Sequence, residues 1–142
     1  MNYKYPLADE KLRSLLMLCL ATLLFSCMSQ TPHYNYADGN ANQYFVTAFS
    51  LQYVPVKPEE SSTGMYSGGE PAEIQLTQKQ FNDLRQLFEK AISATSSHIT
   101  DRVKMSGQVT RTTTSDTVMI ILQPNAPEQI ALESALKGLL GK

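Results

Sequence analysis

The sequence predicts an α+β protein: a two-layer sandwich in which a four-stranded, mainly antiparallel sheet carries two helices on one face. Two kinds of segment predict this class. In some, apolar residues recur at every second position or form a short continuous run; in others they recur at helical spacing. Their order along the chain is β-β-α-β-β-α, which is typical of one sheet covered by helices. With 42% hydrophobic residues, the chain suits one domain with an ordinary core.

The first strand is predicted over 43–54, where a period of two runs through aromatic and β-branched residues. Its apolar face is expected to consist of Phe45, Thr47, Phe49, Leu51 and Tyr53. Pro55 and Pro58 end this strand, a long polar loop follows over 57–69, and 71–76 predicts a short second strand.

A helix is predicted over 78–94. Thr77 and Gln80 have the spacing of a capping box, and apolar residues then recur at helical spacing. They are Phe81, Leu84, Leu87, Phe88, Ala91 and Ile92.

Two further strands and a helix complete the predicted fold. Alternation from Arg102 to Thr110 predicts a strand over 102–111, and a turn is expected over 113–116. The continuous apolar run 117–122 predicts a more buried strand at a central position of the sheet. Pro124 ends it, and Asn125 with Glu128 resembles a capping box for a C-terminal helix that closes near Gly141.

The N-terminus has the layout of a secretory signal. The apolar run 15–25 follows Lys4, Lys11 and Arg13. At ~1.5 Å per helical residue the run covers roughly 17 Å, well short of the ~30 Å hydrocarbon core of a bilayer. A cleaved or lipid-tethered segment is therefore favoured over a transmembrane anchor, the alternative being a core helix that ends in a cysteine.

The end of this run, Leu24-Phe25-Ser26-Cys27, resembles the lipobox of a bacterial lipoprotein precursor, which has a leucine three residues before an obligatory cysteine and a small residue just before it. The resemblance implies that 1–26 is a signal peptide cleaved between Ser26 and Cys27. It also implies a diacylglyceryl group on the Cys27 sulfur and, in many lineages, a further acyl chain such as palmitate on the new amine. Two or more chains make a stable membrane anchor.

The layout after cleavage is predicted to be a flexible tether over 27–42 and a single α+β domain over 43–142. Residues 28–42 are rich in polar and turn-forming types, and their apolar side chains show no period. A tether of this length would hold the domain some 20 Å off a bilayer, at ~5–6 Å × √n.

Composition excludes several function classes. Twelve Lys plus Arg against thirteen Asp plus Glu give a net charge of −1, which removes the electrostatic case for nucleic-acid binding. Two cysteines and two histidines are too few for a zinc finger, an iron–sulfur cluster or a disulfide scaffold. No cofactor and no metal site are expected.

The candidate binding site is the loop that precedes the second strand. It is rich in hydroxyls and glycine and has one aromatic residue that we expect to be exposed; its candidate residues are Ser61, Ser62, Thr63, Tyr66, Ser67, Gly68 and Gly69. Such a loop can direct backbone N–H groups and hydroxyls at an anion or a peptide. It lacks the Gly-Lys-Ser/Thr of a P-loop. The alternative is a wide surface connection in which the glycines make a turn.

Two other groups of residues carry weaker hypotheses. His98, with Asp101 and the hydroxyls of Ser96 and Ser97, offers the residue types of a hydrolase, although types are not geometry. Three basic residues on one predicted strand would form a patch for an anion only if a bulge at Gly107 shifted the register; otherwise they are solvent-side charges. They are Arg102, Lys104 and Arg111.

We therefore expect a small, non-catalytic binding or accessory module of the bacterial cell envelope, anchored by lipid to the inner or outer membrane. Its partner would be an envelope protein or the cell wall, met through the 57–70 loop or the exposed sheet face. The alternative is a small envelope hydrolase that uses His98. A purely structural subunit of an envelope assembly would instead expose a large apolar patch.

Overall fold

The computed structural model describes residues 31–142, so the predicted signal peptide, its cleavage site at Ser26 and Cys27 lie outside the described part. The described elements are seven strands and two α-helices. The strands are β1 (His33–Ala37), β2 (Gln43–Val46), β3 (Ser50–Val54), β4 (Ala72–Gln75), β5 (His98–Ile99), β6 (Gly107–Thr112) and β7 (Thr117–Leu122). The helices are α2 (Gln78–Ser93) and α3 (Pro127–Leu139).

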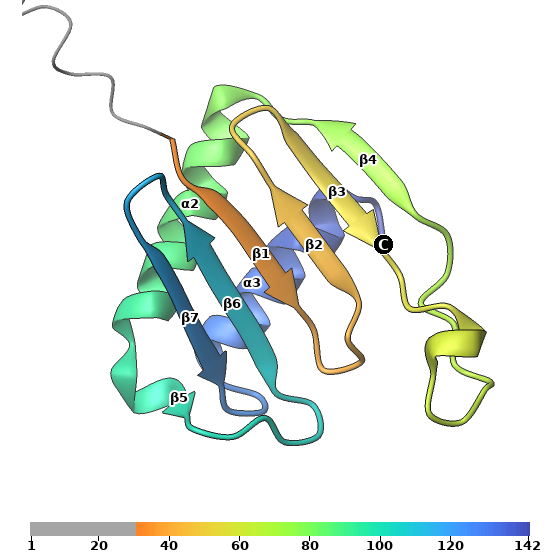
Figure 1. Cartoon of the computed structure of the whole chain (residues 1–142). Helices are drawn as coiled ribbons and strands as arrows, with labels where there is room; N and C mark the ends of the chain where they lie inside the picture. Colours follow the sequence, from red (N-terminus) through yellow and green to blue (C-terminus); the bar gives the residue numbers. More distant parts are fainter. Residues whose placement is uncertain (1–30) are drawn as a thin grey trace, which may run out of the picture. The chain divides into compact units, whose positions relative to one another are not determined.

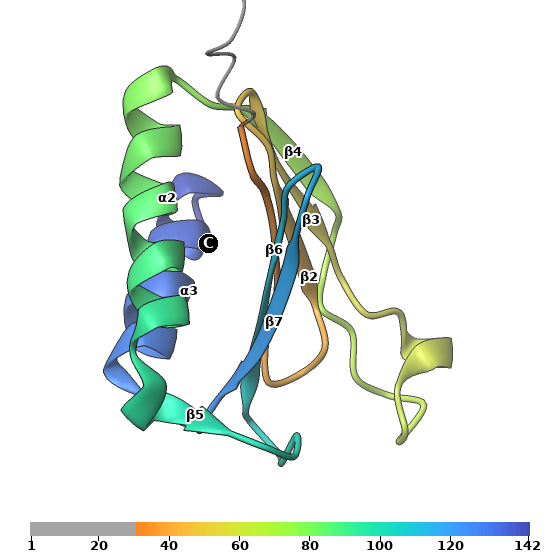
Figure 2. The same cartoon turned by 60° about the vertical axis from the view of Figure 1, so that its left-hand side comes forward.

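All seven strands belong to one antiparallel sheet in the order β4-β3-β2-β1-β6-β7-β5. Both helices lie on the same face of this sheet (Figures 1 and 2). The fold is thus broadly α+β, but the predicted four-stranded sheet with the order β-β-α-β-β-α is wrong. Three strands are additional: β1, β5 and the second half of what the sequence predicts as a single strand over 43–54.

The predicted strand 43–54 is a hairpin, because the chain reverses at 47–50, where the Thr47 N–H donates to the Ser50 carbonyl at 2.9 Å. Val46 lies opposite Leu51, so the core-facing positions are even-numbered in β2 and odd-numbered in β3. The buried residues are accordingly Tyr44, Val46, Leu51 and Tyr53. The apolar face predicted from one unbroken period is therefore wrong in its first half, and Phe45 and Phe49 are 41% and 75% exposed.

Residues 33–42 belong to the domain, which corrects the predicted tether over 27–42 and the domain boundary at 43. β1 pairs with β2 on one side and β6 on the other, so it is the middle strand of the sheet. Tyr34 and Tyr36 are 2% and 0% exposed. Their hydroxyls donate to carboxylates of the helices, to Glu89 at 2.7 Å and to Glu133 at 2.8 Å. Because their hydroxyls are hydrogen-bonded, these tyrosines can lie in the core. They do so in a segment whose composition otherwise resembles that of a linker.

Helix α2 follows the prediction. The Thr77 Oγ accepts from the Gln80 N–H at 3.2 Å, and the Gln80 side chain accepts from the Thr77 N–H at 2.8 Å, which completes the capping box. The residues it buries are Phe81, Leu84, Phe88 and Ala91. Helix α3 instead begins with Pro127 at its first position, and the predicted cap at Asn125 is wrong because Ala126 is the N-cap.

The predicted strand 102–111 begins later than expected, at Gly107. Val103 and Met105 lie in the preceding loop, 50% and 46% exposed, and Met105 has a φ of 67°. Strand β7 has the predicted range but not the predicted central position. It lies next to the edge of the sheet, and β5 pairs only with Ile121 and Leu122.

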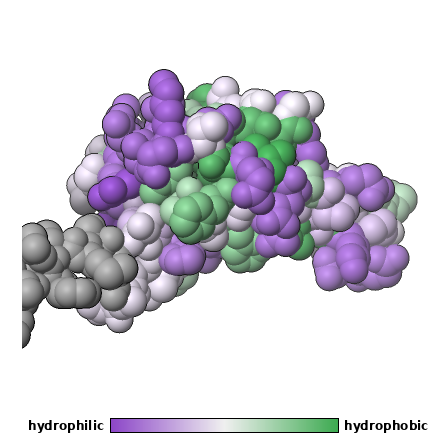
Figure 3. Space-filling model, turned by 90° about the horizontal axis from the view of Figure 1, so that it is seen from above, coloured by the Kyte–Doolittle hydropathy of each residue, from purple (hydrophilic) through white to green (hydrophobic). Residues whose placement is uncertain are grey.

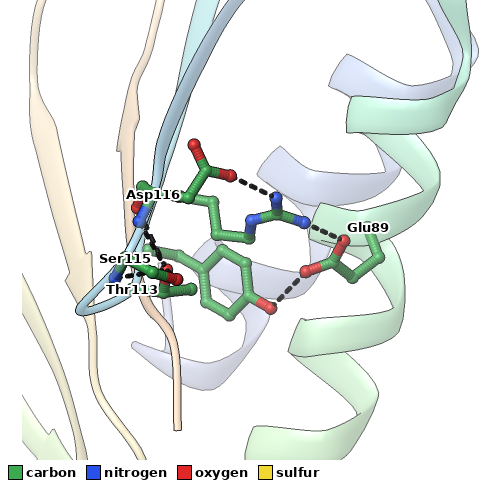
Figure 4. A network of polar contacts seen from close by, with 6 residues as sticks. Glu89, Thr113, Ser115 and Asp116 are labelled. Carbon is green, nitrogen blue, oxygen red and sulfur yellow. Dashed lines mark hydrogen bonds and ion pairs between the residues drawn. The ribbon is translucent and has the colours of Figure 1, made fainter. Parts of the chain in front are cut away.

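A polar network fastens α2 to the sheet (Figure 4). Glu89 accepts from the Tyr34 hydroxyl and, at 2.9 Å, from the Arg111 guanidinium, which also contacts Asp116 at 3.2 Å. Burial together with this carboxylate raises the pKa of Tyr34 above its ordinary value. Desolvation alone would lower the pKa of Arg111, but Glu89 and Asp116 raise it overall. Within 31–142, no helix has both the length and the apolar character needed to cross a bilayer.

Candidate functional site

The 57–70 loop is held closed at its neck, where the chain leaves β3 and returns to β4. The Gly68 N–H donates to the Val56 carbonyl at 2.9 Å, and the buried Tyr53 donates its hydroxyl to the Gly68 carbonyl at 2.7 Å. A short 3-10 turn, Pro58–Glu60, starts the loop, and the Glu60 carboxylate accepts from the Lys57 N–H at 3.1 Å. The loop is therefore an ordered structure with a fixed base.

Asn42 joins this loop to the turn between β1 and β2. Its side chain is buried, and its amide nitrogen donates to Asp38 Oδ2 at 2.8 Å and to the Tyr66 hydroxyl at 2.9 Å. Its amide oxygen accepts from the Val56 N–H at 3.0 Å. One side chain thus satisfies groups from the turn, from the neck and from the middle of the loop.

The β1–β2 turn is itself organised by Asp38. Asp38 Oδ1 accepts from the backbone N–H groups of Asn40 and Asn42, both at 2.9 Å. The Arg102 guanidinium donates to the Asp38 carbonyl at 2.8 Å. The buried carboxylate of Asp38 therefore fixes the turn internally, and its backbone carbonyl joins the turn to the segment before β6.

Gly68 is required by close approach at the neck. A Cβ at this position would collide with the Asn42 amide oxygen and lie 2.8 Å from Pro55 Cβ. The glycine thus lets the loop's backbone pack directly on Asn42.

A groove of about 770 Å³ lies between the loop and the β1–β2 turn. Its walls come from Gly39, Asn40 and Ala41 of the turn, from Val56, Glu60, Ser61, Ser62, Thr63 and Tyr66 of the neck and loop, and from Lys104. The polar side-chain groups are four hydroxyls, one carboxamide, one carboxylate and one ammonium, so the groove has no net charge. It offers both donors and acceptors to a ligand with many hydrogen-bonding groups.

Of the predicted loop residues, Ser61, Ser62, Thr63 and Tyr66 line this groove. Ser67 and Gly69 instead border a second hollow of about 360 Å³ by the prolines of the neck. The expectation that Tyr66 is an exposed aromatic is wrong, because it is half-buried and bonded to Asn42. Asn42 and Asp38 were not predicted, although the dipeptide Asp38-Gly39 is a hairpin-turn signal that could have found them.

The residues of the hydrolase hypothesis do not converge. The His98 Nε2–H donates to the Ala91 carbonyl at 2.8 Å, which orients the ring toward the backbone of α2. The Ser97 hydroxyl donates to Glu128 at 2.7 Å, and this hydrogen bond lowers the pKa of Glu128 below its ordinary value. Ser96 and Asp101 are exposed, and none of the groove's lining residues is His98.

The three basic residues predicted on one strand are separated in the structure. Arg102 and Lys104 lie in the loop before β6, and only Arg111 belongs to a strand, where it contacts α2. The hypothesis of a shared anion patch is therefore wrong. Among residues 31–142, no group of three or more His, Cys, Asp or Glu side chains is arranged to hold a metal ion.

Comparison with models of protein families, with curated proteins and with solved structures finds no match to this chain. The larger volume of the groove and its lining of hydroxyls with one carboxylate and one ammonium distinguish it from the hollow of about 300 Å³ between α2 and α3, which is lined mainly by leucines and small residues together with Gln80 and Asp83.

Proposed function

We propose that this chain is a lipid-anchored, non-catalytic binding module of the bacterial envelope, and that its partner binds in the groove between the 57–70 loop and the β1–β2 turn. The observation that carries the proposal is the attachment of the loop by Asn42. Flexible surface connections do not need a buried asparagine with three satisfied contacts, whereas a binding surface gains affinity from walls ordered before the ligand arrives.

The position of the groove supports this role. β1 enters the domain at His33 and ends at Ala37, directly before the turn that forms one wall of the groove. Five strand residues span roughly 17 Å at ~3.4 Å each. The groove therefore lies at the end of the sheet away from the point where an anchor on Cys27 would connect, as Figure 1 shows for the 57–70 loop and the start of β1.

The lining supports an uncharged or zwitterionic partner with many polar groups, such as an extended peptide segment or a glycan of the cell wall. Hydroxyls, exposed turn backbone and the half-buried Tyr66 suit such a ligand better than a strongly anionic one, because Glu60 balances Lys104. Interfaces built from Tyr, Ser, Gly and Asn use the same combination of a rigid aromatic and adaptable polar contacts.

The anchor is tested on the expressed precursor by intact-mass spectrometry and membrane fractionation. A chain that begins at Cys27 and has the added mass of its acyl groups is expected in the membrane fraction, and Cys27→Ser should leave the protein unprocessed or released. An unmodified Cys27 on an otherwise processed chain would contradict the anchor.

The binding site is tested in the native envelope with a photo-crosslinking amino acid at Ser62, which is exposed and lines the groove. The matched control has it at Gln86, an exposed position on α2. We expect a discrete adduct from position 62 and none from position 86. Equal labelling at both positions, or no adduct from a folded and anchored protein, would contradict the groove as the binding surface.

A further inference from the structure

The corrected boundary of the domain shortens the connection to the proposed anchor. Cys27 precedes the first strand residue, His33, by only six positions. Even fully extended at ~3.5 Å per residue, this stretch spans roughly 20 Å. If Cys27 is acylated, as in the proposed function on which this inference rests, the start of β1 has to lie within this distance of the lipid surface.

The strand register identifies what else lies at this end of the sheet. Tyr34 of β1 is opposite Val46, so the β2–β3 turn over 47–50 lies beside the start of β1. His33 is opposite Thr112, which places the β6–β7 turn there too. The Leu76 N–H donates to the Phe49 carbonyl at 2.8 Å, so the start of α2 adjoins the same turn.

Phe49 projects from this end. It is 75% exposed at the tip of a tight turn, a position where Gly, Asn or Asp is usual. Nothing in the fold requires a phenyl ring here, since the turn is closed by Thr47 and Ser50. Figure 3, which views the molecule from this side, shows apolar side chains gathered between polar ones.

Several of the charged side chains nearby are already paired, although the exposed Arg85, which also acts on Tyr34, is not among them. Lys79 contacts Asp83 at 2.6 Å at the start of α2, and Arg111 contacts Asp116 at 3.2 Å beside the β6–β7 turn. An apolar contact therefore suits this end better than an electrostatic one.

We propose that this end of the domain rests on the lipid bilayer and that Phe49 inserts into the boundary between head groups and acyl chains. Phenylalanine is among the side chains that bury in this zone, because its apolar ring leaves water there. The contact would hold the sheet upright and direct the groove between the 57–70 loop and the β1–β2 turn away from the membrane.

The chain has no tryptophan, so a single substitution provides a specific fluorescent reporter. The experiment uses the lipidated protein with Phe49→Trp, reconstituted in phosphatidylcholine vesicles whose acyl chains bear bromine, a contact quencher of tryptophan. The control is Met65→Trp, since Met65 is 84% exposed in the 57–70 loop at the other end. We expect blue-shifted emission and loss of most of the signal for Trp at position 49, and water-like, unquenched emission for position 65.

Each other outcome has a defined meaning. Unquenched, water-like emission at position 49 in protein that sediments with the vesicles would overturn the inference and leave the anchor intact. Blue-shifted but unquenched emission would show that a second copy of the chain covers Phe49, and would overturn it as well. Equal quenching at both positions would show that the domain has no fixed orientation. A chain without acyl groups, identified by mass, would remove the anchor itself and with it the premise.

Discussion

Replacing Asn42 with alanine should release the 57–70 loop from the domain. The substitution removes three side-chain hydrogen bonds, to Asp38, to Tyr66 and from Val56, and leaves the Val56 N–H without its acceptor. A net intramolecular hydrogen bond contributes about 1 kcal/mol, and an unsatisfied buried donor costs about 1–3 kcal/mol. Because Asn42 is only 3% exposed, water replaces these contacts poorly. We expect the free energy of unfolding to fall by about 3 kcal/mol.

Urea denaturation of the mature protein measures this loss, and amide hydrogen exchange locates it. The N–H groups of Val56 and Gly68 should lose protection far more than those of α2. Asn40→Ala is the matched control, because its backbone N–H alone contacts Asp38; it should change stability by less than about 0.5 kcal/mol. A loss below about 1 kcal/mol for Asn42→Ala, with exchange in the loop unchanged, would refute the role of Asn42 as its attachment.

Three further predictions concern other parts of the domain. Gly68→Ala should destabilise the protein and displace the loop, whereas Gly138→Ala, where a Cβ meets open space, should be neutral or stabilise α3 by up to about 1 kcal/mol; thermal unfolding of both variants checks this. Burial alone would raise the pKa of Glu133, but hydrogen bonds from Lys137, Gln129 and Tyr36 lower it overall. The Glu133 carboxylate therefore stabilises the fold above about pH 4, and this contribution disappears as the pH falls through the lowered pKa. Glu133→Gln should therefore unfold more easily in urea at pH 6, with a difference from the parent that shrinks toward pH 3. A chain that starts at Gln43 should not fold cooperatively, while one that starts at Thr31 should; circular dichroism during heating separates them, and cooperative unfolding of the shorter chain would contradict the central position of β1.

Local signals in the sequence predict the elements whose chemistry is local. Helix α2 has a capping box and a regular apolar stripe, and the structure confirms both. The prediction of one strand over 43–54 fails because the turn at its centre is made by Ala48 and Phe49, neither of which is a turn-forming residue. Without a visible turn, the period of two continues through the reversal and assigns half of the strand to the wrong face.

The position of a strand within the sheet depends on long-range pairing, which the run 117–122 does not encode. A continuous apolar run indicates burial on both faces, but β7 lies near the edge, and its Met119 is 62% exposed. The candidate site likewise combines residues that a local signal predicts with residues that depend on long-range contacts. The hydroxyls of the loop are visible as a cluster in the sequence, whereas the buried pair Asp38 and Asn42 gains its meaning only when the loop folds back on the β1–β2 turn.

Strand β1 explains why a composition-based boundary fails here and what the correct boundary implies. Residues 33–42 include three asparagines, a glycine and an aspartate, yet the two tyrosines of β1 bury their rings and donate their hydroxyls to Glu89 and Glu133. A residue that is apolar along its length and polar at its tip can occupy a core without making the segment look hydrophobic. This strand is the middle of the sheet and begins only six positions after Cys27, and its far end leads into a wall of the groove. If Cys27 carries the proposed anchor, this strand would limit how far the proposed binding surface can lie from the membrane, whereas a long flexible tether would leave that distance and the orientation of the groove free.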